Sequence, residues 1–359
     1  MEGGASYGDA ISLPINLSGS FWLRYLCRMS VSRSVSFSPP PYRAPWYLPN
    51  GHWQTIVPAL TRRVRDFTYQ REALSTPDHD TLQLDVLAAG SSRLVVIAHG
   101  LEGDSNRPYV RGMTRAFHRE GYDVLAWNFR SCGGAPNRQL RFYQSGATDD
   151  LHHLLTHWPF ITRYTDIVLV GFSLGGNLTL KYLGEQGSSL LPTIRGGITF
   201  SVPLDLAACA RRITHPSNRV YHRRFLRQLK QKIVRKHPTF PRDLPLEALA
   251  DVRTLVDFDD RYTAPLHGFR NAQDYYEQCS SKQFLDDIAV PTLIVNAQND
   301  PFLPQSCYLT YPPRRETAIT FVAPVQGGHC GFLPRCHRPG QDYWSEQVAR
   351  RFARTLSAS

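Results

Sequence analysis

Short, continuous runs of apolar residues recur along the chain, separated by stretches with helical periodicity. Such runs are typical of strands that are buried on both faces of a parallel sheet. An earlier pair of stretches, 66–76 and 81–88, alternates apolar and polar residues instead and predicts a hairpin of half-exposed strands. The continuous runs, which predict core strands, lie at 94–98, 124–127, 167–170, 198–200, 292–295 and 318–322.

Helical patterns fill the intervals between these strands. They cover 110–119, 148–156 and 178–185, and an amphipathic helix at 343–356 ends the pattern. Strands that alternate with helices in this way predict a doubly wound, mostly parallel α/β sheet. The chain of 359 residues is long enough for one such domain with an insertion, which we place at 41–358.

The alternation breaks between about 203 and 288, where helical patterns dominate, and this break predicts an inserted helical lid. Apolar side chains recur there at a spacing of four, at Tyr221, Phe225, Leu229 and Ile233. Basic residues fill much of the remaining circumference and indicate an amphipathic basic helix. Two interpretations stay open: a solvated face that packs on the core below, which is the commoner case, and a lid surface that attracts anionic head groups or substrates.

The N-terminal region differs from the rest in composition. Residues 1–40 are rich in Gly, Ser and Pro and predict a poorly ordered arm, so translation from Met1 and from Met29 both stay open. The aromatic, Pro-rich stretch 45–56 follows and predicts an ordered cover on the domain, in which His52 has a structural role.

Cysteine usage and charge narrow the class of protein. The seven cysteines are scattered, odd in number and free of C-x-x-C pairs, which favours reduced thiols in a cytoplasmic protein over a disulfide framework or a zinc site. The net charge of +11 favours weak contact with anionic membrane surfaces. No apolar run is long enough for a membrane span, and no signal peptide is recognisable. We expect no nucleic-acid partner, and the oligomeric state stays open.

The predicted strand at 167–170 leads into the sequence Gly171-Phe172-Ser173-Leu174-Gly175, and a helical pattern follows. A G-x-S-x-G turn between a buried strand and a helix is the nucleophile elbow, which exposes its serine above the sheet. The flanking glycines leave room for a strained turn and for close approach of the strand and the helix. Ser173 is therefore the candidate nucleophile.

An acid and a base follow the serine in the order that this fold requires. Asp300 comes directly after the predicted strand at 292–295, and His329 lies in a Gly-rich loop after the last strand. Ser173 needs His329 to take its proton, and His329 needs Asp300 to orient it. Asp300 alone suits a turn before Pro301, but its occurrence together with His329 predicts a catalytic triad.

Backbone groups after two strands are candidates for the oxyanion hole. The Leu174 N–H follows the nucleophile, and the Leu101 N–H lies in the loop that begins at His99. We interpret His99 as a turn former. For Arg130, a structural ion pair is favoured over binding of a substrate anion. We expect Thr148 to cap the helix that it begins.

These residues resemble the YheT-like branch of α/β hydrolases, the AB hydrolase 4 family, from about Tyr47 to the C-terminus. The resemblance implies the α/β-hydrolase fold and a hydrolase of carboxylic esters, with Ser173, Asp300 and His329 at the matching positions. Ser131 and Gln144 depart from the family pattern, in which Gly and His are usual. The motifs that carry the resemblance are Gly51-His52-Trp53-Gln54-Thr55, His99-Gly100-Leu101-Glu102-Gly103, Asn128-Phe129-Arg130, Gly171-Phe172-Ser173-Leu174-Gly175-Gly176-Asn177, Asp257-Phe258-Asp259, Ala297-Gln298-Asn299-Asp300-Pro301-Phe302 and Gly328-His329-Cys330-Gly331-Phe332.

Taken together, the sequence predicts a serine hydrolase that cleaves small-molecule carboxylic esters, of lipids or of short acyl chains, through an acyl-enzyme. We expect it to need no cofactor and no metal. Two alternatives stay open: a non-catalytic protein that binds lipid or anionic surfaces, and an acyltransferase that uses the same acyl-enzyme. The acyl chain and the physiological substrate depend on the shape of the pocket, which the sequence does not reveal.

Overall fold

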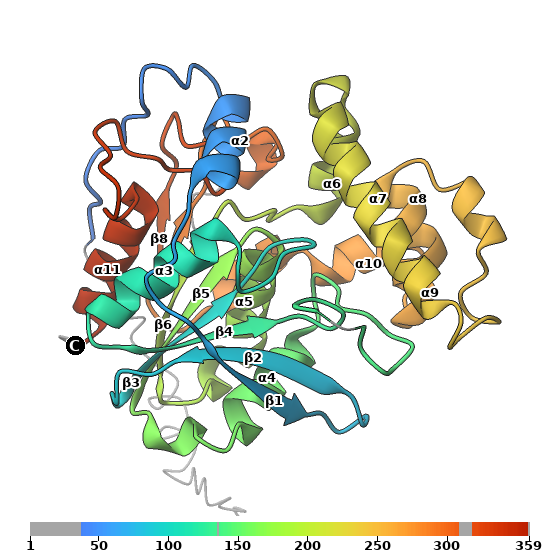
Figure 1. The fold of residues 1–359 in the computed structure, drawn as a ribbon, viewed down its shortest axis with the longest axis horizontal. Coiled ribbons are helices and arrows are strands. Elements are labelled where there is room, and N and C mark those ends of the chain that lie inside the picture. The colour runs from blue at the N-terminus through green and yellow to red at the C-terminus, as the bar shows by residue number, and fades with distance from the viewer. Residues whose placement is uncertain (1–36, 135, 309–317, 358–359) are drawn as a thin grey trace, which may run out of the picture. The chain divides into compact units, whose positions relative to one another are not determined.

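The computed structural model describes residues 37–134, 136–308 and 318–357. The predicted arm at 1–40 and both candidate start sites lie outside these residues, except for the arm's last four positions. One eight-stranded sheet forms the centre of the described part, with the order β1-β2-β4-β3-β5-β6-β7-β8 (Figure 1). Its strands are β1 (Gln70–Ser75), β2 (Thr81–Leu87), β3 (Arg93–Ala98), β4 (Asp123–Asn128), β5 (Asp166–Phe172), β6 (Ile194–Phe200), β7 (Thr292–Val295) and β8 (Ile319–Val322).

Strand directions confirm the predicted fold class. β1 and β2 form the predicted antiparallel hairpin, in which Ser75 pairs with Thr81, and β2 also pairs antiparallel with β4. Every other pair in the sheet is parallel. β6 begins four residues earlier than predicted because Gly196 and Gly197 interrupt its apolar pattern, although both pair with β5 after a register shift that follows Ile194.

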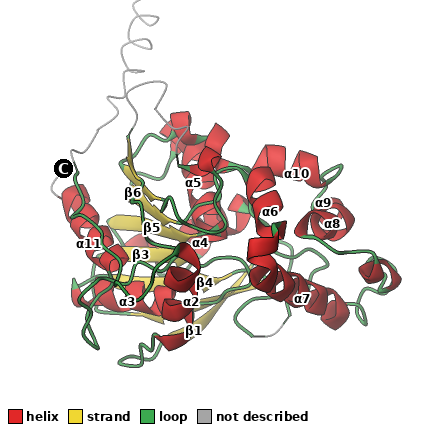
Figure 2. Ribbon diagram, turned by 90° about the horizontal axis from the view of Figure 1, so that it is seen from above, coloured by secondary structure: helices red, strands yellow, loops and turns green. Residues whose placement is uncertain are grey.

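Helices cover both faces of the sheet and bury its β-branched side chains. α3 (Pro108–Arg119) and α11 (Trp344–Ser357) lie side by side on one face (Figures 1 and 2). Their Phe117 and Phe352 pack in one core cluster with Val95. On the other face, α4 (Thr148–His157) and α5 (Leu174–Gln186) pack in a second cluster with Val96. Neighbouring residues of β3 thus face opposite layers, which explains the continuous apolar runs.

The segment between β6 and β7 is helical. Figures 1 and 2 show its helices gathered beside the sheet. They are α6 (Leu206–Thr214), α7 (Arg219–Lys236), α8 (Leu255–Phe258), α9 (Ala264–Leu266) and α10 (Ala272–Cys279), with a π-helical turn at Asp259–Thr263. α7 is the predicted basic helix, and Ile233 on its apolar side is fully buried. That this segment acts as a lid stays a prediction.

Short 3₁₀ turns complete the described chain. They lie at Ile161–Arg163, Gly187–Ser189, Pro216–Asn218, Glu247–Ala250, Ser281–Gln283, Leu285–Asp287 and Gln305–Cys307.

One further helix lies within the predicted cover. α2 (Gly51–Thr61) begins after Asn50, whose side chain accepts hydrogen bonds from the N–H groups of His52 and Trp53. A Cβ atom at Gly51 would lie 1.8 Å from the carbonyl oxygen of Asn299, so only glycine allows this approach. Glycine, proline and aromatic residues hide the helix from the sequence pattern, because each of them has a low helix propensity.

Candidate active site

Ser173 stands at the sharp turn between β5 and α5. Its backbone has φ 53° and ψ −120°, a strained conformation for a residue with a side chain. A Cβ atom at Gly171 would lie 2.6 Å from the Gly175 carbonyl oxygen, and one at Gly175 would lie 2.5 Å from the Ala98 carbonyl oxygen. The two glycines therefore let α5 and β3 close around the turn. The strand, turn and helix around Ser173 are those that the sequence predicts.

The loops after β7 and β8 bring Asp300 and His329 together. The Nδ1 atom of His329 lies 2.8 Å from the Oδ2 atom of Asp300. The carboxylate of Asp300 is fully buried, and its other oxygen accepts a hydrogen bond of 2.9 Å from the Phe302 N–H. The imidazole of His329 is 13% exposed, on the side that faces the pocket. The hydrogen bond to this buried carboxylate fixes the orientation of the imidazole ring.

The charge of Asp300 sets the protonation of His329. Burial by itself lowers the pKa of the imidazole, but the negative charge of Asp300 outweighs it and raises the pKa above its ordinary value. The negative charge of Asp300 thus stabilises the protonated form of the His329 ring, the imidazolium.

Ser173, His329, Leu101 and Leu174 line one pocket, while Asp300 lies beneath it. The described residues form no hydrogen bond to the Ser173 hydroxyl, so it is available to a molecule in the pocket. The pocket holds about 1010 Å³ of empty space, part of it open to solvent. Helices between β6 and β7 supply much of its apolar wall, with Leu206, Ile213, Phe225, Leu229, Leu255 and Phe258.

Two backbone N–H groups beside Ser173 have no hydrogen-bond partner among the described residues. Leu174 is the first residue of α5, where an N–H has no partner within the helix. On the loop after β3, the N–H of Gly100 donates to the Tyr109 hydroxyl at 3.0 Å and that of Glu102 to the Tyr143 hydroxyl at 3.0 Å. The Leu101 N–H between them donates to no described residue. A Cβ atom at Gly100 would lie 3.0 Å from the Ser173 Cβ, so this loop abuts the serine.

Helix α2 contributes residues that the sequence analysis missed. The side-chain oxygen of Gln54 accepts hydrogen bonds from the Gly327 N–H at 2.8 Å and from the Asn299 amide at 3.0 Å. The Thr55 hydroxyl accepts one of 2.8 Å from the His329 N–H. These contacts fix the loops that carry Asp300 and His329. Both residues lie in the motif Gly51-His52-Trp53-Gln54-Thr55, which carries the family resemblance, but the sequence did not reveal their role.

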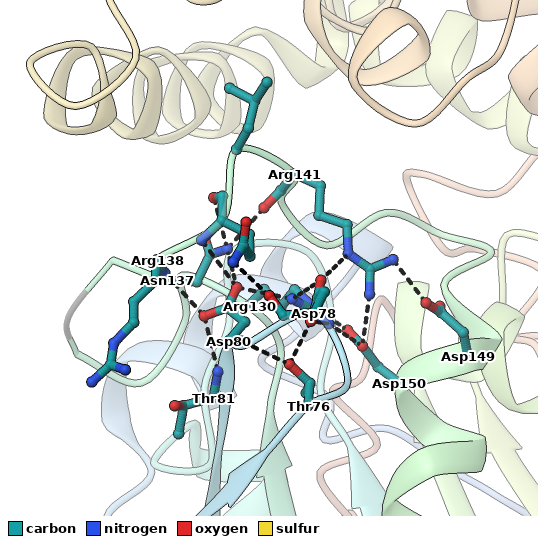
Figure 3. Close-up of polar contacts among 12 residues, drawn as sticks. Thr76, Asp78, Asp80, Thr81, Arg130, Asn137, Arg138, Arg141, Asp149 and Asp150 are labelled. Carbon is teal, nitrogen blue, oxygen red and sulfur yellow. Dashed lines mark hydrogen bonds and ion pairs between the residues drawn. The ribbon is translucent and has the colours of Figure 1, made fainter.

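Arg130 lies outside the pocket, in a buried ion-pair cluster (Figure 3). Its guanidinium contacts Asp78 at 2.9 Å, Asp80 at 2.8 Å and Asp150 at 2.7 Å. The structural interpretation of Arg130 is thus confirmed. The expected cap at Thr148 is wrong: Thr148 is already helical, no side chain caps α4, and its hydroxyl donates to Glu185 at 2.6 Å.

His99 is structural, as predicted. It is buried, and its Nδ1 lies 2.8 Å from the Gly100 carbonyl oxygen while its Nε2 accepts a hydrogen bond from the Phe129 N–H. Burial lowers the pKa of His99 to about 3, which keeps the ring neutral. His52 on α2 stacks against Tyr221 of α7.

Comparison with known proteins places the chain among hydrolases. A family model described as "alpha/beta hydrolase fold" matches residues 93–335. A protein of Escherichia coli named "Putative esterase YheT" is 37% identical over 79% of this chain and 84% of its own length. The human proteins named phospholipase ABHD3 and monoacylglycerol lipase ABHD2 are 25% and 28% identical, over 85% and 79% of this chain and 76% and 72% of their own lengths.

Solved structures agree in fold. The Pyrococcus furiosus esterase Pf2001 superposes with a TM-score of 0.51 at 17% identity, over 82% of this chain and 96% of that one. Similarity at this level shows the fold alone. In the part of the chain that the structure describes, no helix has both the length and the apolar character to cross a bilayer.

Proposed function

From the premise that this chain belongs to the α/β hydrolase family, in its YheT-like branch, we propose that it is a serine hydrolase that cleaves carboxylic esters. Membership of the family makes the chain a hydrolase. The observation that carries the finer proposal is the strained backbone of Ser173, which presents the hydroxyl in the same pocket as His329. Strain of this kind persists where function requires it.

The proposed reaction has two steps. Ser173 Oγ attacks the ester carbonyl while His329 takes the hydroxyl proton, and the same proton then goes to the departing alcohol. This step forms the acyl-enzyme and breaks the ester C–O bond. A water molecule, deprotonated by His329, next attacks the acyl-enzyme and releases the carboxylic acid and free Ser173. Asp300 stabilises the imidazolium that forms in each step.

The oxyanion of each tetrahedral intermediate needs hydrogen-bond donors. We assign this role to the N–H groups of Leu101 and Leu174, because both are free and both lie beside Ser173. Donors held by a rigid turn and a helix start need no rearrangement as the charge develops, which makes such sites effective.

The apolar wall of the pocket supports an acyl chain as the part of the substrate that it binds. In this proposal the helical segment at about 203–288 acts as the lid of the domain at 41–358. Its basic helix α7 supports weak contact with anionic membrane surfaces. The six described cysteines are free thiols, which supports the cytoplasm as the place of action.

A fluorophosphonate probe, which reacts with activated serines, tests the proposal. Wild-type protein is expected to become labelled, Ser173→Ala to lose the label, and Asp300→Asn to be labelled more slowly. Ser188→Ala, which removes an exposed serine, is the matched control and keeps the label. Equal labelling of wild type and Ser173→Ala would overturn the assignment. Absence of label and of ester turnover in folded wild type would favour a lipid-binding protein.

A panel of p-nitrophenyl esters of graded chain length, with and without added glycerol, identifies the acyl group and the acceptor. Release of free acid in water supports hydrolysis. Release of acylglycerol as the dominant product in dilute glycerol would instead establish acyl transfer from the same acyl-enzyme.

A further inference from the structure

A second pocket opens on the other side of Ser173. It shares Ser173, His329 and Leu101 with the first pocket but is walled by α2, by the start of α3 and by the start of α7. It holds about 1570 Å³ of empty space, part of it open to solvent. Ser173 therefore lines both pockets. This arrangement suits an ester, whose acyl and alcohol parts lie on opposite sides of the scissile bond and can each occupy one pocket.

The two pockets differ in charge. Among the described residues, the first pocket is lined by one lysine and no arginine, and this lysine, Lys232, pairs with Glu102 at 2.8 Å. Arg62, Arg107 and Arg224 line the second pocket. Arg62 pairs with Glu346 at 2.6 Å. Among the described residues, neither Arg107 nor Arg224 has a carboxylate within ion-pair distance.

These two arginines line the same pocket, and among the described residues neither has a counter-ion. Arg107 stands just before α3 and donates a hydrogen bond to the Glu102 carbonyl oxygen, while Arg224 lies on α7. Partial desolvation and then the positive charge of Arg107 lower the pKa of Arg224, so the two guanidinium groups repel each other. Glu102, the carboxylate that lines the same pocket, is engaged by Lys232.

Arg107 is partly buried and Arg224 is exposed, whereas Arg62, the third arginine of this pocket, is buried and carries Glu346 as its partner. Two cations that line one pocket without a counter-ion repel each other, and a bound anion relieves this repulsion. Guanidinium groups match phosphate oxygens in geometry as well as in charge. An acyl chain suits the apolar first pocket, which leaves the second pocket for the alcohol part of the ester.

We propose that Arg107 and Arg224 form a subsite for a phosphate group on the alcohol part of the substrate. This inference rests on the proposed ester hydrolysis and specifies its leaving group: a phosphorylated alcohol such as a glycerol phosphate. The phosphate binds between the two guanidinium groups, and the ester carbonyl then reaches Ser173 from the second pocket while the acyl chain extends into the first.

Two esters with the same acyl chain test the subsite, namely 1-octanoylglycerol and 1-octanoylglycerol 3-phosphate. At low salt, wild type is expected to show a kcat/KM at least tenfold higher for the phosphorylated ester. Arg224→Gln is expected to reduce this ratio about tenfold, mainly through KM, and 0.5 M NaCl reduces it in wild type. Arg223→Gln removes the neighbouring exposed charge of α7, which does not line the pocket, and is the matched control that keeps the ratio.

Calorimetry with glycerol 3-phosphate measures the subsite without turnover. Ser173→Ala protein is expected to bind glycerol 3-phosphate, and Ser173→Ala/Arg224→Gln to bind it at least tenfold more weakly. Equal kcat/KM values for the two esters in wild type, or a ratio of kcat/KM that Arg224→Gln does not change, would overturn the proposed subsite. Neither result would contradict ester hydrolysis by this protein. Glycerol 3-phosphate binding that depends on Arg224, in a protein that turns over no ester, would support the subsite and reject the hydrolysis.

Discussion

Replacement of Arg130 by Met removes the cation at the centre of the cluster in Figure 3. The side chain of Arg130 is 1% exposed, and those of its partners Asp80 and Asp150 are 1% and 6% exposed. Without the guanidinium these carboxylates stay buried and lose their central cation; Asp80 keeps only hydrogen bonds from neutral groups, and Asp150 keeps its contact with Arg141. Breaking a buried ion pair from one side costs about 3–5 kcal/mol of the free energy of unfolding. That loss is a large part of the stability of a typical domain, about 5–15 kcal/mol.

Arg141 provides the matched control, because it contacts Asp78 and Asp150 from a side chain that is 33% exposed. Arg141→Met is expected to cost about 0–1 kcal/mol, as partly exposed pairs do. Urea unfolding at pH 7 measures both variants. With a slope near 3 kcal/mol/M, the midpoint of Arg130→Met falls by about 1 M or more. Equal midpoints for the two variants would refute the reasoning, since Arg130 is buried and pairs with the buried Asp80, while Arg141 is partly exposed and pairs with the exposed Asp149.

The pH dependence gives a second check. Burial raises the pKa of Asp78, but the Thr76 hydroxyl and Arg130 outweigh it and lower the pKa to about 2. A lowered native pKa stabilises the fold above the unfolded pKa of about 3.9, and this stabilisation is lost as the pH falls toward 2. Without Arg130, the buried carboxylates take up protons more readily. The difference in free energy of unfolding between wild type and Arg130→Met is therefore expected to be smaller at pH 4 than at pH 7. A difference that does not change with pH would contradict an electrostatic cause.

Three further outcomes are expected. Asp300→Asn removes the charge that raises the pKa of His329, so the acid limb of the profile of kcat/KM against pH is expected to move to lower pH. The same substitution is expected to lower kcat by about 10³–10⁴-fold. An acid limb that does not move would contradict the role assigned to Asp300. Gly175→Ala places a Cβ 2.4 Å from the His99 carbonyl oxygen and costs about 1–3 kcal/mol or more by urea unfolding, against about 1 kcal/mol for Gly268→Ala in open space. Lys232→Met leaves Glu102 buried without its cation and costs about 3 kcal/mol by thermal unfolding, part of which Lys232→Met/Glu102→Gln recovers.

The sequence by itself determined the positions of the core strands and the order of the candidate nucleophile, acid and base along the chain. Runs of β-branched residues gave the core strands because a strand between two helical layers must be apolar on both faces. The elbow at Ser173 and the loops of Asp300 and His329 could be placed because each follows a strand that is visible locally. The fold class was predictable for the same reason. Asp300 and His329 form a hydrogen bond, and Ser173 lines the same pocket as His329. That the three act as a catalytic triad stays a proposal, which the probe experiment tests.

Only the tertiary structure decided which distant residues meet. Gln54 precedes Gly327 by more than half of the chain, yet its side chain holds the loop of His329. Arg130 takes partners from a hairpin and a helix that the sequence pattern treats as separate elements. Arg107 and Arg224 line one pocket only because the start of α3 and the start of α7 both border it in the folded chain. Periodicity predicts whether a side chain is buried, because burial depends on which face of its own helix or strand the residue occupies. The partner of that side chain depends on how the helices and strands pack against one another, and no local sequence pattern contains this information.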